Sequence, residues 1–95
     1  MKLIYKHSPI CIVSLKAKLE VNKVLKKYDQ YLDYEFVDVT QERGRSDEIA
    51  GTYDIRHESP QVIIVDEKKG PVWYGSHFEI TSKKISDILD ELVEQ

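Results

Sequence analysis

One hydrophobic run, residues 61–66, limits the folds open to this chain more than any other segment. It reads Gln-Val-Ile-Ile-Val-Asp, so four β-branched apolar residues follow one another between two polar ones. A short apolar run without alternation is typical of a strand that is buried on both faces. Such a strand needs a layer of other elements on each side of its sheet.

The segments around this run predict the remaining layers. Residues 3–6 and 34–39 have the composition of strands, and residues 71–75 predict a strand that returns from a hairpin loop at 67–70. Pro71 places this last strand at a sheet edge, because proline donates no ladder hydrogen bond. Apolar residues three and four positions apart predict helices over residues 12–28 and 44–53, and a last helix that is capped by Thr81 or Ser82.

The resulting order is β-α-β-α-β-β-α. A helix joins the first two strands, so we expect them to be parallel with a right-handed crossover, whereas the last two strands form an antiparallel hairpin. The predicted fold class is α/β: a mixed four-stranded sheet flanked by helices, which is the minimal thioredoxin/glutaredoxin-like architecture. We expect residues 1–95 to form a single domain of this kind.

Composition narrows the possible partners and location. The net charge of -3 provides no basic surface, which argues against nucleic-acid binding. No apolar run approaches the roughly 18–20 residues of a membrane span, and no signal-peptide pattern is present. The single cysteine rules out an internal disulfide and fits a reducing compartment, so the sequence predicts a cytoplasmic protein. The short chain and its polar helix faces favour a monomer.

The single cysteine, Cys11, falls between the first predicted strand and the first helix. Unpaired N–H groups and the helix dipole at that position favour thiolate over thiol, and the thiolate is the nucleophile. Ser14 lies one turn further on, where it either caps a backbone N–H or donates to the sulfur. Lys6 is a further candidate for lowering the pKa of the thiol.

Less specific interpretations apply to several of these residues. A lone intracellular cysteine is often a small buried hydrophobe, but the strand–turn–Cys–helix context together with Pro60 favours a nucleophile. His7, His57 and His77 fall near predicted element ends, where a histidine on its own is more often a turn or capping residue than a catalyst. The spacings of these histidines and Cys11 match no common zinc pattern, so no metal site is predicted.

Three stretches together resemble one family, the monothiol bacilliredoxins (YtxJ-like bacillithiol-system proteins). The stretches are Tyr-Lys-His-Ser-Pro-Ile-Cys-Ile-Val-Ser at 5–14, His-Glu-Ser-Pro-Gln-Val at 57–62 and Ser-His-Phe-Glu-Ile-Thr at 76–81. The first resembles the family's K-H-S-x-x-C-x-x-S segment, and the second its cis-proline segment. The resemblance implies a thioredoxin-like fold, thiol exchange with bacillithiol as co-substrate, and a role in oxidative stress.

The resemblance implies a mechanism with Cys11 as the catalytic nucleophile. Its thiolate attacks the mixed disulfide between a client protein and bacillithiol, and an external thiol resolves the adduct, with no permanently bound cofactor. Ser14 and His7 are expected to support the thiolate. Ser59 and Pro60, joined by a cis bond, are expected to form the substrate groove.

The small thiol is expected to be held by Ser76 and His77. These residues lie where the sequence places the start of the last helix, and a helix start can bind an anion.

Two alternatives to this mechanism are open, and one departure from the family favours the first of them. The family usually has a proline directly after the cysteine, whereas this chain has Ile12. This favours, as an alternative, a binding or regulatory module that keeps the fold without the chemistry. An iron–sulfur carrier is a second alternative, although Cys11 and Ser14 match only the two ends of the C-G-F-S motif.

Overall fold

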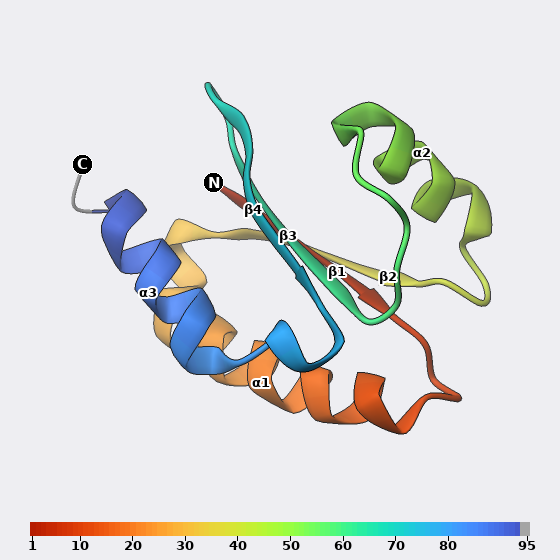
Figure 1. Cartoon of the computed structure of the whole chain (residues 1–95). Helices are drawn as coiled ribbons and strands as arrows, with labels where there is room; N and C mark the ends of the chain where they lie inside the picture. The colour runs from red at the N-terminus through yellow and green to blue at the C-terminus, as the bar shows by residue number, and fades with distance from the viewer. Residues whose placement is uncertain (94–95) are drawn as a thin grey trace.

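Four strands form one sheet in the computed structural model, which describes residues 1–93 (Figure 1). The elements follow the predicted order, with β1 (Lys2–His7), α1 (Ile12–Tyr28), β2 (Asp33–Asp38), α2 (Arg43–Tyr53), β3 (Gln61–Asp66), β4 (Gly70–Ser76) and α3 (Ser82–Val93). Two short 3-10 turns, η1 (Asp29–Tyr31) and η2 (His77–Glu79), were not predicted. The fold class predicted from the sequence is therefore confirmed.

The strand order in the sheet is β2-β1-β3-β4. As predicted, β1 and β2 are parallel, while β3 is antiparallel to both β1 and β4. As predicted, Pro71 lies on an outer strand of the sheet, opposite Val65 of β3. The register of β3 and β4 shifts between Ile64 and Val65, next to this position.

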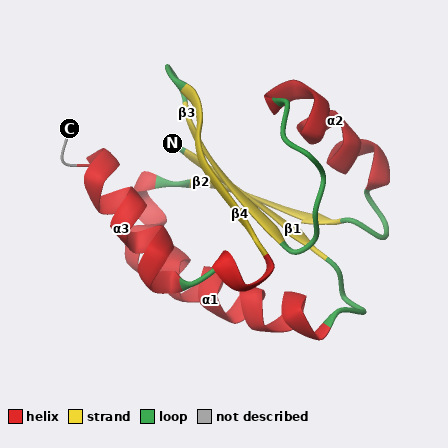
Figure 2. Cartoon of the chain, viewed as in Figure 1, coloured by secondary structure: helices red, strands yellow, loops and turns green. Residues whose placement is uncertain are grey.

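Helices cover both faces of the sheet, α1 and α3 on one side and α2 on the other (Figure 2). Side chains of the two central strands alternate between these faces, so Leu3 and Tyr5 pack with α1 and α3, whereas Ile4 and Ile63 pack with α2. From Gln61 to Val65 every residue of β3 is buried. The two-sided burial expected of this strand is confirmed.

An ion pair attaches α2 to the sheet, which matters because this helix has only a weak apolar face. The Arg45 guanidinium donates from Nε and Nη2 to the two carboxylate oxygens of Glu35 on β2, at 2.6 and 2.7 Å. Lys2 lies 2.8 Å from the same carboxylate. These contacts, those of Arg45 above all, lower the pKa of Glu35 to about 2. The bidentate geometry fixes the start of α2 over β2.

Replacing Ile63 by alanine should strongly destabilise the protein. Ile63 is fully buried between β1, β4 and α2, so its loss leaves a cavity that costs about 2–5 kcal/mol in the free energy of unfolding. Urea unfolding followed by circular dichroism measures this value. Ile10→Ala is the matched control, because Ile10 is 88% exposed and its truncation should change stability by less than about 0.5 kcal/mol. Equal effects of the two changes would contradict this account of the core.

Candidate functional site: the thiol at the start of α1

A tight turn carries the chain from β1 to α1 and places Cys11 at the helix start. The Cys11 N–H donates to the Ser8 carbonyl at 3.1 Å, which closes a turn with Pro9 at its second position. Cys11 has extended backbone angles and is the N-cap residue of α1, and its carbonyl accepts the N–H of Leu15. The thiol therefore lies beside the unpaired N–H groups of the first helical turn.

Hydrogen bonding at this helix start favours the thiolate of Cys11. The backbone N–H of Ser14 lowers the pKa of the thiol most, and the backbone of Val13 and the Ser14 hydroxyl act in the same direction, although none makes a standard side-chain cap. Partial desolvation opposes them, but the net pKa lies below that of an ordinary cysteine. The side chain is partly exposed. An accessible thiol with a lowered pKa is suited to nucleophilic exchange.

Ser14 is held rigidly beside the sulfur. It is fully buried, and its hydroxyl accepts the Ser8 N–H at 3.1 Å while it also lowers the pKa of Cys11. The two roles left open by the sequence are thus compatible: one hydroxyl accepts from the turn and donates toward the thiol.

His7 does not reach the thiol directly but joins it through Tyr5. The Tyr5 hydroxyl donates to the Ser14 carbonyl at 2.8 Å and lies 2.7 Å from His7 Nδ1. Because the tyrosine proton is used on the carbonyl, His7 Nδ1 is assigned as the protonated nitrogen that donates to Tyr5. Burial lowers the pKa of His7. The sequence analysis missed Tyr5, although Tyr5 and His7 are two apart in a strand and so share a face.

The predicted groove residues lie at the start of β3. The Ser59–Pro60 peptide bond is cis, and the Pro60 carbonyl accepts the backbone N–H of His77 at 3.0 Å. This bond ties the Pro60 loop to η2, which in turn contacts α1. The Ser59 hydroxyl is buried without a hydrogen-bond partner among the described residues. Residues 59, 60 and 77 are thus brought together.

The premise for placing Ser76 and His77 at the start of the last helix is wrong. That helix, α3, begins at Ser82, and Thr81 caps it by accepting the Lys84 N–H at 3.2 Å. Ser76 and Glu79 instead form a capping box around η2, in which the Glu79 carboxylate accepts the Ser76 N–H at 3.0 Å. The Ser76 hydroxyl is used in this box, whereas the His77 side chain is exposed.

Lys6 does not act on the thiol as the sequence suggested. Its side chain is fully buried on the α2 face of β1, and Nζ donates to the Ser46 carbonyl at 3.0 Å. His57 Nδ1 lies 3.2 Å from the same ammonium. The signal was available: Leu3 and Tyr5 occupy the α1 face, so strand alternation sends Lys6 to the other one.

Exposed apolar side chains flank the thiol. Ile10 is 88% exposed, Ile12 is 83% exposed and Phe78 on η2 is 73% exposed. Lys16 lies 6.0 Å from the centre of the Phe78 ring, which places η2 beside the first turns of α1. The neighbourhood of Cys11 thus combines an accessible sulfur with apolar surface.

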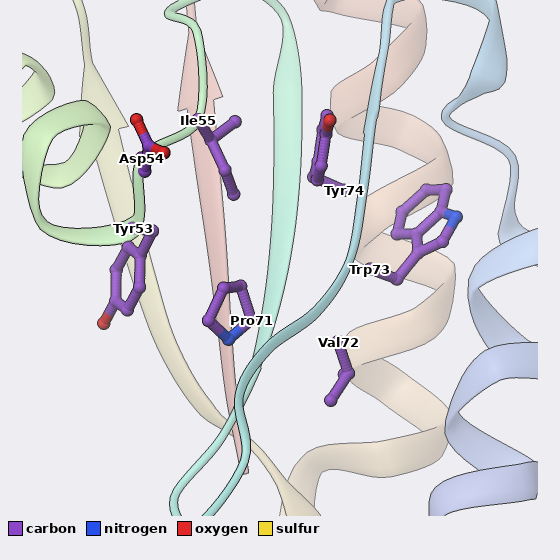
Figure 3. A pocket seen from close by; sticks show the side chains of 7 residues that line it. All are labelled: Tyr53, Asp54, Ile55, Pro71, Val72, Trp73 and Tyr74. Atoms are coloured by element: carbon purple, nitrogen blue, oxygen red, sulfur yellow. The ribbon is translucent and has the colours of Figure 1, made fainter.

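An open pocket elsewhere in the molecule is separate from the thiol. It lies between the end of α2 and strand β4, where Figure 3 shows Tyr53, Asp54 and Ile55 across from Pro71 and Tyr74. None of its lining residues is a predicted site residue. Within residues 1–93, no helix is long and apolar enough to cross a membrane, and no group of three His, Cys, Asp or Glu side chains is placed to hold a metal ion.

Comparison with known structures supports the fold. A solved structure titled as a putative oxidoreductase with a thioredoxin fold superposes with a TM-score of 0.77 at 33% identity, covering 90% of this chain and 74% of that one. Thioredoxin 1 from the thermophilic eubacterium Thermosipho africanus superposes with a TM-score of 0.74 at 19% identity, covering 99% and 96%. A malaria-parasite thioredoxin-2 gives 0.75 at 17% identity, covering 95% and 81%.

Comparison with protein families gives a more specific result. The sequence model described as "Monothiol bacilliredoxin BrxC" matches residues 1–85, a range that includes Cys11, the Pro60 loop and η2. The match therefore spans all four strands and every predicted site residue. Together with the thioredoxin fold, it supports a redox function in thiol–disulfide exchange. This chain belongs to the monothiol bacilliredoxin family.

Proposed function

We propose that the protein removes a low-molecular-weight thiol, bacillithiol, from mixed disulfides on client proteins. The observation that carries this proposal is the hydrogen-bonded, partly exposed Cys11 at the N-cap of α1, whose pKa is lowered. The family match and the thioredoxin fold support the reaction class.

The proposed reaction has two exchange steps. In the first, the Cys11 thiolate attacks the bacillithiol sulfur of the mixed disulfide. The old S–S bond breaks, the client leaves as a thiolate that takes up a proton from water, and Cys11 carries bacillithiol as a new disulfide. In the second, an external thiolate attacks the bacillithiol sulfur of this disulfide, Cys11 leaves as a thiolate, and bacillithiol departs in a disulfide with the external thiol. The chain has no second cysteine, so the attacking thiol comes from another molecule.

The neighbouring residues have distinct proposed roles. Ser14 stabilises the thiolate directly, while His7 acts only through Tyr5. The Ser59–Pro60 segment is the proposed groove for an extended client segment. For the small thiol, His77 is the stronger candidate of the predicted pair, because its side chain is exposed and its backbone is bonded to Pro60. The cycle needs a supply of reduced small thiol, as in a cytoplasm.

Incubation with oxidised bacillithiol should give one adduct on Cys11. Intact-mass spectrometry should detect a single added bacillithiol on the unaltered protein and none on Cys11→Ser. Oxidised glutathione, in a parallel incubation, tests which small thiol is preferred. Lack of any adduct, with Cys11 still open to alkylation, would contradict the exchange mechanism and favour a binding module that has lost the chemistry.

Replacing Ser14 by alanine should slow the reaction of Cys11. The change removes a hydrogen bond that favours the thiolate, and a bond of this kind is worth about 0.5–1.5 kcal/mol, which corresponds to roughly twofold to tenfold in rate at neutral pH. The pH profile of the rate of iodoacetamide alkylation should shift to higher pH. Ser86→Ala on α3 serves as the control and should leave the profile in place. An unchanged profile for Ser14→Ala would remove the Ser14 hydroxyl from the thiolate site and leave the backbone N–H groups of Ser14 and Val13 as the groups that lower the pKa of Cys11.

A further inference from the structure

Lys6 is a charged side chain that the fold buries completely. Burial of an ammonium is costly unless it is fully hydrogen-bonded. Burial accordingly lowers the pKa of Lys6, and the charge of Asp47 opposes this effect. Among the described residues, Lys6 Nζ donates to the Ser46 carbonyl on α2 at 3.0 Å and lies 3.2 Å from His57 Nδ1.

These bonds fix the orientation and tautomer of His57. A lysine ammonium only donates, so Nδ1 accepts from it and the neutral ring carries its proton on Nε2. The Ser46 hydroxyl lies 3.1 Å from the same Nδ1. The residue as a whole is exposed. One edge of an exposed ring is therefore held from inside the protein by a strand and a helix.

His57 lies in the irregular segment that joins α2 to β3, residues 54–60, which runs past the end of β1 (Figure 1). Other bonds hold the first part of this segment, and the bond from the His77 N–H to the Pro60 carbonyl holds its end. The Ile55 N–H donates to the Ala50 carbonyl at 3.1 Å, and Gln61 Nε2 donates to the Arg56 carbonyl at 3.0 Å. Gln61 is the strand partner of Lys6 and is also fully buried. Between Arg56 and Pro60, the described hydrogen bonds tie the segment to the sheet through the His57 ring.

We propose that Lys6 is a positioning residue for client binding, which acts through His57 on the segment that leads into Ser59 and Pro60. This assignment rests on the proposed function and adds a residue remote from the thiol. Lys6 sets the shape of the groove and leaves the reactivity of Cys11 unchanged, because the groups that lower the pKa of Cys11 come from Ser14 and Val13.

The bond between Lys6 Nζ and His57 Nδ1, called the clamp below, should be lost in acid. Protonation of His57 removes the acceptor for Lys6 and places two cations side by side. The charged groups around the ring are Lys6 from β1, Asp47 from α2 and Glu58 from the segment itself; burial and Lys6 lower the pKa of His57, and the two carboxylates oppose them. The neutral ring thus holds the clamp above the ordinary histidine pKa of about 6.5, and the clamp is lost as pH falls through the lowered value.

The test compares a client probe with a small reagent. The probe is a cysteine peptide carrying bacillithiol as a mixed disulfide, and the small reagent is iodoacetamide. Lys6→Met should raise the KM for the peptide about tenfold, the loss expected for a hydrogen bond to a charged group, with kcat and the alkylation rate of Cys11 unchanged. Lys84→Met, on the exposed surface of α3, should leave every value unchanged.

Two further variants separate positioning from folding. His57→Leu removes the acceptor at an exposed position and should raise KM as Lys6→Met does, so it carries the test if Lys6→Met fails to fold. His57→Gln offers Lys6 a neutral amide oxygen, and it should keep the KM of the unaltered protein while losing the rise in KM on acidification. If Lys6 and His57 acted only through packing, His57→Gln would not keep the KM of the unaltered protein.

Unchanged KM in Lys6→Met or His57→Leu, with exchange intact, would overturn the assignment and leave the proposed function standing. A parallel fall in alkylation rate would also overturn it, because Lys6 would then act on the thiol. Absence of peptide exchange by the unaltered protein would instead overturn the proposed function, and the assignment with it.

Discussion

The two-sided burial of β1 and β3 is the constraint on which the rest of the structure depends. Both strands have their side chains enclosed on each face, so the sheet needs helices above and below it. The parallel pairing of β1 and β2 requires α1 to cross one face, and α1 must therefore start at the carboxyl end of β1. That requirement places Cys11 at a helix N-terminus, whatever side chain the residue carries.

Local hydrogen bonds, and not a neighbouring positive charge, favour the thiolate at this position. Lys6 is only five residues before Cys11, but strand alternation turns it to the opposite face, where it bonds α2 and His57. The effects on the thiol come from Ser14 and Val13, which lie in its own helical turn. A network from His7 through Tyr5 reaches the Ser14 carbonyl and so supports the turn from beneath. The groups that favour the thiolate and the bonds of Lys6 to α2 and His57 therefore belong to different sets of residues.

Sequence patterns predicted most of the fold because they report burial and periodicity. The apolar run of β3, the proline of β4 and the three-and-four spacing of the helices each depend on local geometry, and the structure has the corresponding elements within about one residue, apart from the more loosely predicted end of α3. The position of Cys11 followed from element order. The capping box at η2 was missed because a serine followed three residues later by glutamate was interpreted as the approach to α3. The bond between Lys6 and His57 joins residues 51 positions apart, and no local pattern reports such a pair.

Hydrogen bonds in the turn before α1 explain how this helix begins without the proline that is usual after the cysteine in this family. A proline at the first helical position presets the backbone angle of that residue. Here Ile12 takes that position with its side chain 83% exposed, and α1 nevertheless starts at residue 12. The Ser8–Cys11 turn and the bond from the Ser8 N–H to the Ser14 hydroxyl fix the first turn from the other side. Replacement of the proline therefore leaves the thiol in place and adds an exposed apolar side chain beside it. This side chain and that of Ile10, 88% exposed, thus place apolar surface on both sides of Cys11 in the chain.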